Sequence, residues 1–303
     1  MRRPSLNKMD IQHILMLLPF LALFLIFIVI PVLLAIIFSF TDFNLVQFPS
    51  FVGLENYVRM FLDDDVFLIA LKNTLVFALF TGPLSYILCL SLAWLVNELN
   101  PKIRTIFTFC LYVPSMFTGA YSVWAYIFSG DQYGFVNNFL LRFGLIHEPI
   151  QFLTNSEYIM SVVILVQLWL SLGTAFLSFL AGFQGIDKQQ YEAAAIDGIS
   201  NRFQEFWFIT IPSMGPQLLF GAVMQIGASF ASGAIGQQLL IAAGAAVDGV
   251  STDYAATTIV THMTDVGTNY MEMGYACSIA VFLFAMMLLF NSAIQKFLKK
   301  HSD

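Results

Sequence analysis

Apolar residues gather into six long blocks, separated by shorter polar segments. No block contains an Asp, Glu, Lys, Arg or His residue, and each is long enough to cross a bilayer as a helix of about 20 residues. The pattern predicts an all-α integral membrane protein with six transmembrane helices, at residues 14–40, 73–96, 105–128, 158–183, 217–240 and 274–294.

The composition also indicates a membrane protein. Hydrophobic residues make up 58% of the chain and charged residues 11%, which leaves more apolar surface than one water-soluble core would bury. The first apolar block is much longer than the ~7–15 apolar residues of a cleavable signal peptide, and no small-residue cleavage site follows it. We therefore expect this block to remain as the first span.

The basic residues predict the orientation of the spans. If the N-terminus is cytoplasmic, ten of the 13 Lys and Arg residues fall in inner segments and three in outer ones, as the positive-inside rule requires. Six spans then place both termini in the cytoplasm, so that residues 1–13 form an N-terminal segment, 14–297 the membrane domain and 298–303 a tail. The inner residues are Arg2, Arg3, Lys8, Lys102, Arg104, Lys188, Arg202, Lys296, Lys299 and Lys300; the outer ones are Arg59, Lys72 and Arg142.

The spans carry no ionisable group that would couple a solute to an ion gradient. Ion-coupled transporters place such groups within the membrane, and the chain also lacks the G-x-x-x-x-G-K-[ST] loop that binds ATP phosphates. Both observations favour a conduit that is passive or driven by another chain. An ion-coupled secondary transporter stays open, because carbonyls and hydroxyls can bind Na⁺, and so does a membrane scaffold without transport.

Other kinds of chemistry are not indicated. Cys89, Cys110 and Cys277 all fall inside predicted spans, where they read as small apolar residues. No metal-ligand spacing and no nucleophile with an acid–base partner stands out, so we expect no catalytic residue, metal or cofactor on this chain. The net charge of −6 gives no reason to expect nucleic acid as a partner; the composition indicates membrane lipid instead.

The connection between the fourth and fifth spans, residues 184–213, predicts structure of its own. It contains the stretch QQYEAAAIDGIS at 189–200, preceded by Asp187, and Asp187 with Gln190 three positions later is a variant of the helix capping box. Gly198 is suited to end the helix that begins there. We expect this helix to present a face of small groups, made of Tyr191, Ala194, Ala195 and Gly198.

A second helical piece is predicted after this break. It is rich in aromatic residues and leads to Ile211 and Pro212 at the start of the fifth span. A helix, a break, another helix and a proline would make a rigid protrusion on the cytoplasmic side. The aromatic residues are Phe203, Phe206, Trp207 and Phe208.

At these residues the chain resembles a known family. EAAAIDG, followed by Pro in FITIPSMGPQ, is similar to the EAA loop of binding-protein-dependent ABC importer permeases of the sugar-permease family, which includes maltose-type and glycerol-phosphate-type subunits. The likeness covers nearly the full length. Its other segments are FVGLENYVRMF (51–61), ALKNTLVF (70–77), YVPSMFTGAYSVWAYIFS (112–129), GFVNNFL (134–140) and EMGYACSIAVFLF (272–284).

The resemblance implies a set of partners. In that family six spans form half of a pore, a homologous sister permease forms the other half, and two cytosolic ATPase subunits bind ATP and Mg²⁺ and drive transport. An extracytoplasmic solute-binding protein delivers the cargo, and the EAA helix seats in a cleft of one ATPase. By itself an alanine-rich capped helix is a common loop element.

The resemblance also implies roles for particular residues. Carried over residue by residue, it assigns coupling to the ATPase to Glu192, Ala193, Ala194, Asp197, Gly198 and Pro212. Asp187 stands where the family often has Pro, and either residue can begin a helix. The connection 241–273 lacks the Gly-Gly-Pro that the family commonly shows, so no outer-gate assignment carries over to it.

Neutral polar and aromatic residues in spans three to five are candidates for a substrate pathway. Pro114 lies about 15 Å from the inner end of span three, near the middle of the bilayer, where it either lines a cavity or forms a kink that neighbouring helices repack. Hydroxyls, amides and aromatic faces suit a sugar, although helix packing and interfacial belts use the same residues. The expected cargo is a carbohydrate, with an oligosaccharide favoured and polyols or sugar phosphates as alternatives. The candidates are Tyr112, Ser115, Tyr121, Trp124, Gln167, Trp169, Gln225 and Ser229.

Overall fold

The structure is a computed structural model that describes the backbone of residues 8–117, 119–246 and 249–302. Residues 1–7 and 303, which belong to the two predicted cytoplasmic termini, lie outside the described residues. Over the described ranges the chain is helical, and its only β-pairing is one isolated bridge between Thr41 and Phe51. The predicted all-α class is confirmed.

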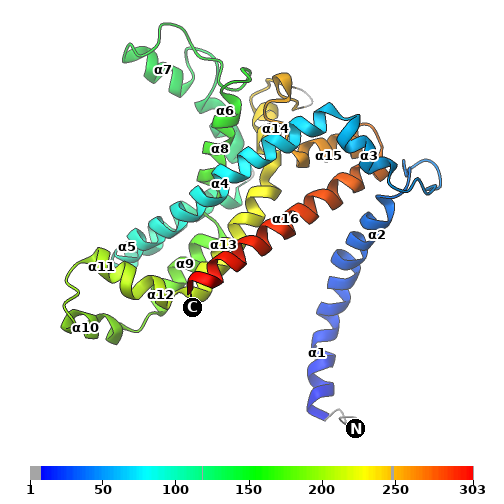
Figure 1. Ribbon diagram of the computed structural model, residues 1–303. Helices are drawn as coiled ribbons and strands as arrows, with labels where there is room; N and C mark the ends of the chain where they lie inside the picture. The colour runs from blue at the N-terminus through cyan, green and yellow to red at the C-terminus, as the bar shows by residue number, and fades with distance from the viewer. Residues whose placement is uncertain (1–7, 118, 247–248, 303) are drawn as a thin grey trace. The chain divides into compact units, whose positions relative to one another are not determined.

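Helices cover each of the six apolar blocks (Figure 1). Among the described residues, four helices are long and apolar enough to cross a membrane, or six if each bent pair counts as one span. The first block holds α1 (Lys8–Phe24), the π-helical turn η1 (Leu25–Val29) and α2 (Ile30–Phe38); the second holds α4 (Asp65–Asn97); the third holds α5 (Pro101–Met116) and α6 (Ala120–Ile127); the fourth holds α8 (Ile159–Leu170) and α9 (Thr174–Gly185); the fifth holds α13 (Gly215–Ala231), the 3₁₀ turn η3 (Ser232–Ala234) and α14 (Ile235–Ala242); the sixth holds α16 (Met273–Ser302).

Shorter elements occupy the connections. The 184–213 connection folds as expected into two helical pieces separated by a break. The short helices of the other connections were not predicted, because a piece of two or three turns gives little periodic signal. The predicted pieces are α10 (Lys188–Ile196), α11 (Arg202–Glu205), the π-helical turn η2 (Phe206–Thr210) and α12 (Ile211–Ser213); the missed ones are α3 (Glu55–Leu62), α7 (Phe135–Arg142), the 3₁₀ turn η4 (Thr252–Tyr254) and α15 (Ile259–Thr268).

The helix of the second block begins before the apolar span predicted at residues 73–96. Asp64 caps α4, because its side chain accepts a hydrogen bond from the Phe67 N–H at 2.8 Å, and the helix therefore begins at Asp65. Hydropathy marks where the apolar block starts, whereas an N-cap marks where the helix starts. The two differ here because the first turns of α4 are polar, with Asp65 and Lys72 among their residues.

The chain divides into two compact units, of which the first comprises Met1–Asp63 and Met263–Phe282. Within it, the buried Asn56 amide donates to the carbonyl oxygens of Ser39 and Thr41, each at 2.9 Å, which fixes the turn after α2. Arg59 pairs with Glu272 at 2.8 Å. None of the span Met16–Phe38 is buried within this chain, so its apolar side chains are free to face lipid or another subunit.

The second unit comprises Asp64–His262 and Leu283–Asp303. In it α4, α9 and α13 pack along one another (Figure 1). A β-carbon on Gly221 would lie 2.2 Å from the Phe179 ring, so a residue without a side chain is needed where α13 meets α9. Cys89 and Met214 are fully buried in the same cluster as Phe179.

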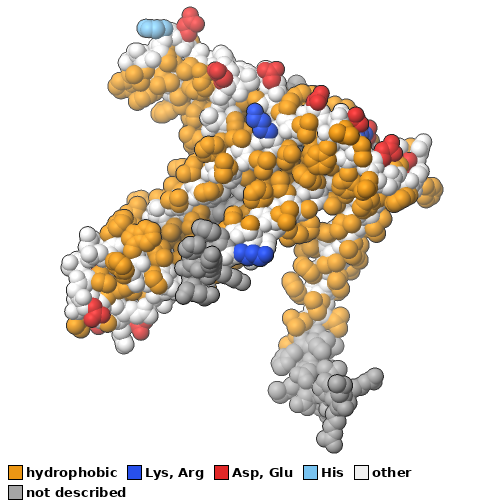
Figure 2. Space-filling view, viewed as in Figure 1, with side chains coloured by type: hydrophobic (Ala, Val, Ile, Leu, Met, Phe, Trp, Pro, Cys, Tyr) orange, Lys and Arg blue, Asp and Glu red, His pale blue; other side chains and the backbone are white. Residues whose placement is uncertain are grey.

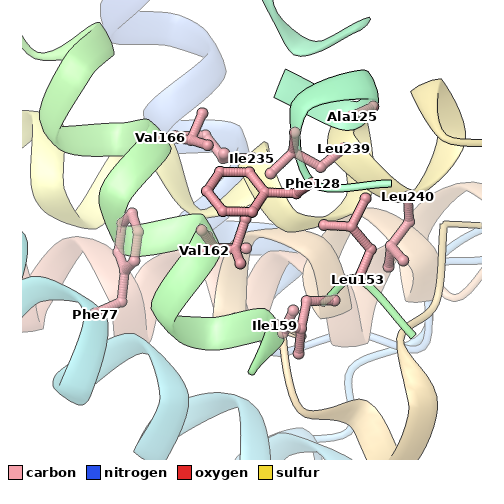
Figure 3. Close-up of a cluster of buried hydrophobic side chains, with 12 residues drawn as sticks. Phe77, Ala125, Phe128, Leu153, Ile159, Val162, Val166, Ile235, Leu239 and Leu240 are labelled. Carbon is pink, nitrogen blue, oxygen red and sulfur yellow. The ribbon is translucent and has the colours of Figure 1, made fainter. Parts of the chain in front are cut away.

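A second hydrophobic cluster joins α6, α8 and α14 to α4 (Figure 3). Its side chains come from four helices and from the connections beside them, and they interdigitate around Phe128 and Val162. The cluster holds α6 and α14 against α8. Its buried members are Phe77, Ala125, Phe128, Leu153, Ile159, Val162, Val163, Val166, Ile235, Leu239, Leu240 and Ala256.

Polar contacts fasten the segment around η4 to the start of α4. The Asn73 amide donates to the carbonyl oxygens of Tyr254 and Thr257, each at 2.9 Å. The His262 Nε2 lies 2.8 Å from an Asp64 carboxylate oxygen, with both side chains about nine-tenths buried. This anchoring lies in the connection for which the sequence resemblance supplied no assignment.

Candidate functional site

A cavity opens where three helices are interrupted in the second unit. Phe117 and Gly119, which lie between α5 and α6, are not helical, α8 and α9 meet at a bend of 40°, and α13 ends in the tight turn η3. The cavity has a volume of about 520 Å³ and takes lining residues from all three interruptions. Interrupted helices leave backbone groups free, which membrane proteins tolerate where the backbone lines a cavity.

The breaks in spans three and four face each other. Pro114 lines the cavity two residues before α5 ends, and the Phe117 N–H bonds to the Pro114 carbonyl. A β-carbon on Gly173 would lie 3.6 Å from the Ser115 hydroxyl oxygen, at ordinary contact distance. Of the two roles considered for Pro114, the structure places it at a cavity wall.

Five of the eight candidate pathway residues line this cavity. Their side chains are hydroxyl, amide or aromatic groups, and they come from α5, α6, α8 and α13. Contact of these residues with a substrate stays a prediction. They are Tyr112, Ser115, Tyr121, Gln167 and Gln225.

The structure places the other three candidates away from the cavity wall. Trp124 stacks on Phe128 and meets Trp169 edge-on, with ring centroids 6.0 and 6.1 Å apart, so it belongs to the hydrophobic cluster of α6. Trp169 is 44% exposed on the outside of this chain. Ser229 donates to the Ile226 carbonyl and lines a second, apolar cavity between α4, α13 and α16. The sequence predicted that these three residues lie within membrane spans, but it did not predict which way each side chain points.

Three hydroxyl residues of the lining were not predicted from the sequence. Ser171, Thr174 and Ser232 all stand at the helix interruptions. The available signal was the combination of a small hydroxyl residue with glycine, in SLGT at 171–174 and SG at 232–233. With these residues included, every polar side chain of the lining is neutral.

Gln225 connects the cavity to the helix interruption in span four. Its amide nitrogen donates to the Ser171 carbonyl at 3.2 Å and lies 3.1 Å from the Cys89 sulfur. Cys89 in turn donates to the Ser171 carbonyl at 3.4 Å. Since α8 ends just before Ser171, these donors satisfy a carbonyl at its end.

The helix α10 begins and ends as the sequence predicted. The Asp187 carboxylate accepts from the Gln189 N–H at 3.0 Å at its start. At its end Gly198 has φ +95°, and the Ile199 N–H bonds to the Ala194 carbonyl, as in a Schellman motif. A β-carbon on Gly198 would meet nothing within 4 Å, so the left-handed backbone is the feature that requires glycine here.

The face of small groups expected on α10 is divided between the chain's interior and its surface. Ala194 is buried within the chain, and the Tyr191 hydroxyl hydrogen-bonds the Thr210 hydroxyl at 2.9 Å. Gln190 was expected to complete the capping box, but its side-chain oxygen instead accepts from the Ser213 hydroxyl at 2.9 Å. These contacts fasten α10 to η2 and α12, which run directly into α13.

The opposite side of α10 is exposed. Glu192, Ala193, Ala195 and Asp197 lie on it, together with Ile196, which is 87% exposed. Of the residues assigned to coupling by resemblance, this surface displays Glu192, Ala193 and Asp197, while Ala194 packs inward. Pro212 lies in α12, at the exit of the connection.

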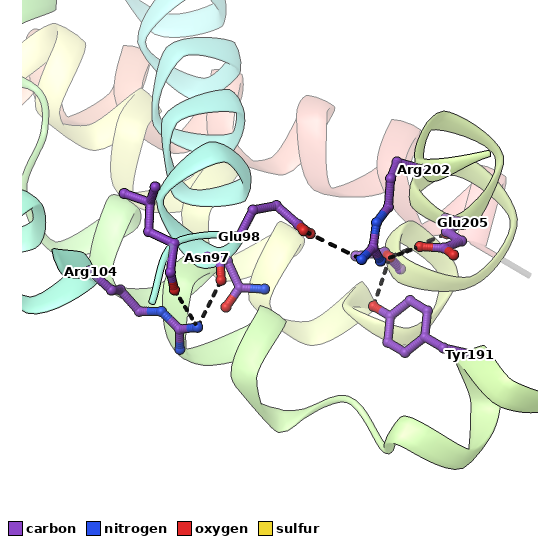
Figure 4. Close-up of polar contacts among 8 residues, drawn as sticks. Asn97, Glu98, Arg104, Tyr191, Arg202 and Glu205 are labelled. Carbon is purple, nitrogen blue, oxygen red and sulfur yellow. Dashed lines mark hydrogen bonds and ion pairs between the residues drawn. The ribbon is translucent and has the colours of Figure 1, made fainter. Parts of the chain in front are cut away.

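Charged contacts join α11 to the end of α4 (Figure 4). Arg202 donates to the Glu205 carboxylate at 2.7 Å and lies 3.7 Å from the Glu98 carboxylate. The bond to Glu205 and then the charge of Glu98 raise the pKa of the Arg202 guanidinium, so it stays positively charged. Arg202 and Glu98 are exposed and Glu205 is partly buried, so the pairs orient the loop more than they stabilise the fold.

A second arginine caps α4 itself. Arg104 donates to the carbonyl oxygens of Asn97 and Leu99, at 2.8 and 3.2 Å, as Figure 4 shows. A cation at a helix C-terminus satisfies carbonyls that have no partner within the helix. The C-terminal end of α4 and the N-terminal end of α5 are thereby held together beside the 184–213 connection.

Helices long enough to cross a membrane, interrupted around a cavity of neutral polar groups, define a membrane solute permease. The chain belongs to the family of binding-protein-dependent transport system inner membrane components, which matches residues 85–301. It is therefore a multi-pass inner-membrane protein.

Similar proteins agree with this assignment. The probable ABC transporter permease protein YesP of Bacillus subtilis (strain 168) is 32% identical over 91% of this chain and 86% of its own. The lactose transport system permease protein LacF of Rhizobium radiobacter is 35% identical over 73% and 74%. A bacterial alginate ABC transporter, crystallised in complex with an alginate pentasaccharide-bound periplasmic protein, has the same fold, with a TM-score of 0.76, 24% identity and coverage of 97% and 95%.

Proposed function

We propose that this chain is one permease subunit of an ATP-driven ABC importer for carbohydrates. The observation that carries the proposal is the cavity, whose polar side chains are all neutral hydroxyls, phenols and amides placed where three helices are interrupted. Sugars present hydroxyls that pair with such groups and C–H faces that stack on aromatic rings. The volume of about 520 Å³ lies within the usual range of small-molecule sites.

We further propose a neutral oligosaccharide as the cargo. LacF, which is similar to this chain over most of its length, is named for lactose transport. A neutral cavity wall favours an uncharged sugar over a sugar phosphate, because a buried phosphate needs cationic partners. Polyols remain compatible with the same lining.

The topology proposed from the basic residues is six spans with both termini in the cytoplasm. It makes each bent pair one span and places α10, α11 and α12 on the cytoplasmic side. The positive-inside rule supports it, with ten Lys and Arg residues inside and three outside.

The partners proposed for this subunit follow from that topology. A homologous second permease completes the pathway as a heterodimer, and an extracytoplasmic solute-binding protein delivers sugar to the outer side. Two cytosolic ATPase subunits bind ATP and Mg²⁺. The exposed side of α10, with Glu192, Ala193 and Asp197 around Ile196, is the surface that we assign to one of them.

We propose alternating access as the mechanism, with α13 as the connecting element. Motion of α10 passes through the Tyr191–Thr210 and Gln190–Ser213 hydrogen bonds into η2 and α12. These lead into α13, which carries Gln225 at the cavity and bonds the interrupted end of α8. Closure of the ATPases thus reaches the cavity wall through a short series of rigid helices.

Reconstitution of the complete complex in proteoliposomes tests the proposal. We expect uptake of a labelled neutral oligosaccharide to need the solute-binding protein, ATP and Mg²⁺, and to continue when an ionophore dissipates ion gradients. Uptake that stops with the ionophore and ignores ATP would establish an ion-coupled secondary transporter instead. Absence of any solute movement, with all subunits present, would favour a scaffold.

A further inference from the structure

The helix α7, between spans three and four, displays an aromatic face. Phe135, Phe139 and Phe143 follow one another at four-residue spacing, so they share one side of the helix. Their side chains are 66%, 52% and 68% exposed, and those of the flanking Tyr133 and Leu145 are 70% and 67% exposed. Figure 2 shows hydrophobic side chains gathered over this helix. We call Phe135, Phe139 and Phe143 the α7 aromatic face.

The helix that displays this face is held firmly. Asn137, on the opposite side of α7, is fully buried, and its amide nitrogen donates to the carbonyl oxygens of Ser129 and Ile150 at 3.0 and 2.9 Å. The Asn137 side-chain oxygen accepts from the Ile150 N–H at 2.9 Å. A β-carbon on Gly134 would lie 2.3 Å from the Ser129 carbonyl oxygen, so glycine permits this close seating. The aromatic face is therefore a fixed surface.

These same contacts fix the level of α7 relative to the membrane. Ser129 lies two residues beyond the end of α6, and in the topology proposed above α5 and α6 together form the third span. Direct bonds from Asn137 to Ser129, and contacts between α6 and α7, hold the helix at the end of that span. A helix placed at the end of a membrane span lies at the boundary between acyl chains and headgroups.

The side chains suit that boundary. Aromatic residues concentrate at membrane interfaces, and short amphipathic helices bury an apolar face there. Arg142 lies on the exposed side of α7 beside the aromatic face, where a long cationic side chain can reach lipid phosphates. If the three phenylalanine rings faced water, their apolar surface would stay exposed, and contiguous apolar patches of this kind usually mark a contact with a partner or a membrane.

We propose that the α7 aromatic face inserts into the lipid of the outer leaflet and anchors the connection between spans three and four to the membrane surface. The occupant is phospholipid, with the rings among the upper acyl chains and Arg142 among the headgroups. The inference concerns a part of the chain that the transport proposal does not use, and the measurement below needs no transport.

Fluorescence quenching in lipid nanodiscs tests this proposal on the complete complex. The Phe139→Trp variant is assembled with phosphatidylcholines brominated near the headgroup end or near the methyl end of the acyl chain. After subtraction of the parent protein, which contains Trp94, Trp124, Trp169 and Trp207, we expect blue-shifted emission from the introduced tryptophan. We expect stronger quenching by the shallow bromines than by the deep ones.

A matched variant in the same connection provides the control. Glu148 is exposed and lies outside the aromatic face, so Glu148→Trp should show water-like emission that a soluble quencher reduces and brominated lipid does not. Phe143→Trp provides a second position on the face if Phe139→Trp assembles poorly.

Two results would overturn the proposal. Emission from both face variants that matches the Glu148→Trp control would place the face in water. Blue-shifted emission that neither quencher reduces would mean that protein covers the face. Comparison with and without the solute-binding protein would then distinguish that protein from the second permease as the cover.

Discussion

Gln225 links the wall of the cavity to the interruption in span four. Its amide nitrogen serves the Ser171 carbonyl at the end of α8 while the residue lines the cavity. The neighbouring position Ser229, one turn further along α13, lines the apolar cavity, which Gln225 also borders, and does not line the polar one. Two polar residues of one helix thus have different surroundings, and substitutions at them should have different effects.

Replacement of Gln225 by Leu should impair transport. The change removes one of several donors to the Ser171 carbonyl, which should cost about 0.5–1.5 kcal/mol of stability, and it removes an amide from the cavity wall. We expect a higher substrate concentration at half-maximal uptake and a lower unfolding free energy. Ser229→Ala is the control, and equal loss of uptake in both variants would argue against the cavity as the pathway.

Gly198 acts through its backbone, because φ is +95° and the surrounding space is open. Gly198→Val should force a β-branched residue into a left-handed conformation at a cost of about 1–2 kcal/mol and disturb the end of α10. We expect the protein to remain in the membrane while the ATPase no longer co-purifies with it.

Two further variants separate this backbone effect from a general effect of added bulk. Gly198→Asn should retain more association than Gly198→Val, because Asn tolerates a positive φ. Gly227→Ala should be neutral, since a β-carbon there also meets nothing within 4 Å. Normal transport by Gly198→Val would show that the end of α10 has no part in coupling.

At the scale of elements, we expect α10 and α13 to move together, because hydrogen bonds from Tyr191 and Gln190 attach α10 to the segment that leads into α13. The Tyr191 hydroxyl meets the Thr210 hydroxyl at 2.9 Å, and Thr210 is buried. Because η2 and α12 continue directly into α13, the bond joins a surface helix to the cavity wall. This connection depends on two residues 19 positions apart in the chain.

Removal of either hydroxyl should uncouple ATP hydrolysis from transport. Tyr191→Phe and Thr210→Val each delete the bond, at about 0.5–1.5 kcal/mol. We expect fewer sugars moved per ATP. Since Thr210→Val also loses the bond from the Thr210 hydroxyl to the Glu205 carbonyl, the double variant should be no worse than Thr210→Val alone. Tyr126→Phe, an exposed position in α6, is the control; full additivity in the double variant would indicate two independent effects.

At the scale of the whole molecule, the topology decides which surfaces meet which partners. The proposed arrangement places the 184–213 connection in the cytoplasm and the α7 connection outside. Every partner assignment depends on this separation, since an ATPase can reach only the inner surface and a solute-binding protein only the outer one.

Cysteine labelling from one side of the membrane tests this arrangement. In a background with Cys110 and Cys277 replaced by Ser, Gln189→Cys should react with an impermeant maleimide only in inside-out vesicles. Glu148→Cys should react only in right-side-out vesicles, because both positions are exposed on opposite sides of the proposed topology. The reverse pattern would invert the orientation and remove the basis for ATPase docking at α10.

The sequence by itself determined the features that depend on local residue pattern and on whether a segment is surrounded by lipid or by water. Apolar blocks without charge define the positions of the membrane helices, because each uncharged block satisfies its backbone internally only as a helix. Asp187 and Gly198 likewise define the limits of α10, because an acidic cap and a left-handed glycine act within a few residues.

Only the tertiary structure decided which polar groups meet. Ser171, Thr174 and Ser232 join the cavity because three helix interruptions come together, whereas Trp124 packs in the hydrophobic cluster of α6 and Ser229 lines the second cavity. Gln190 bonds Ser213 across 23 positions instead of completing the capping box. Side-chain direction around a helix is set by the neighbours that pack on it, and those neighbours are brought together only by the fold.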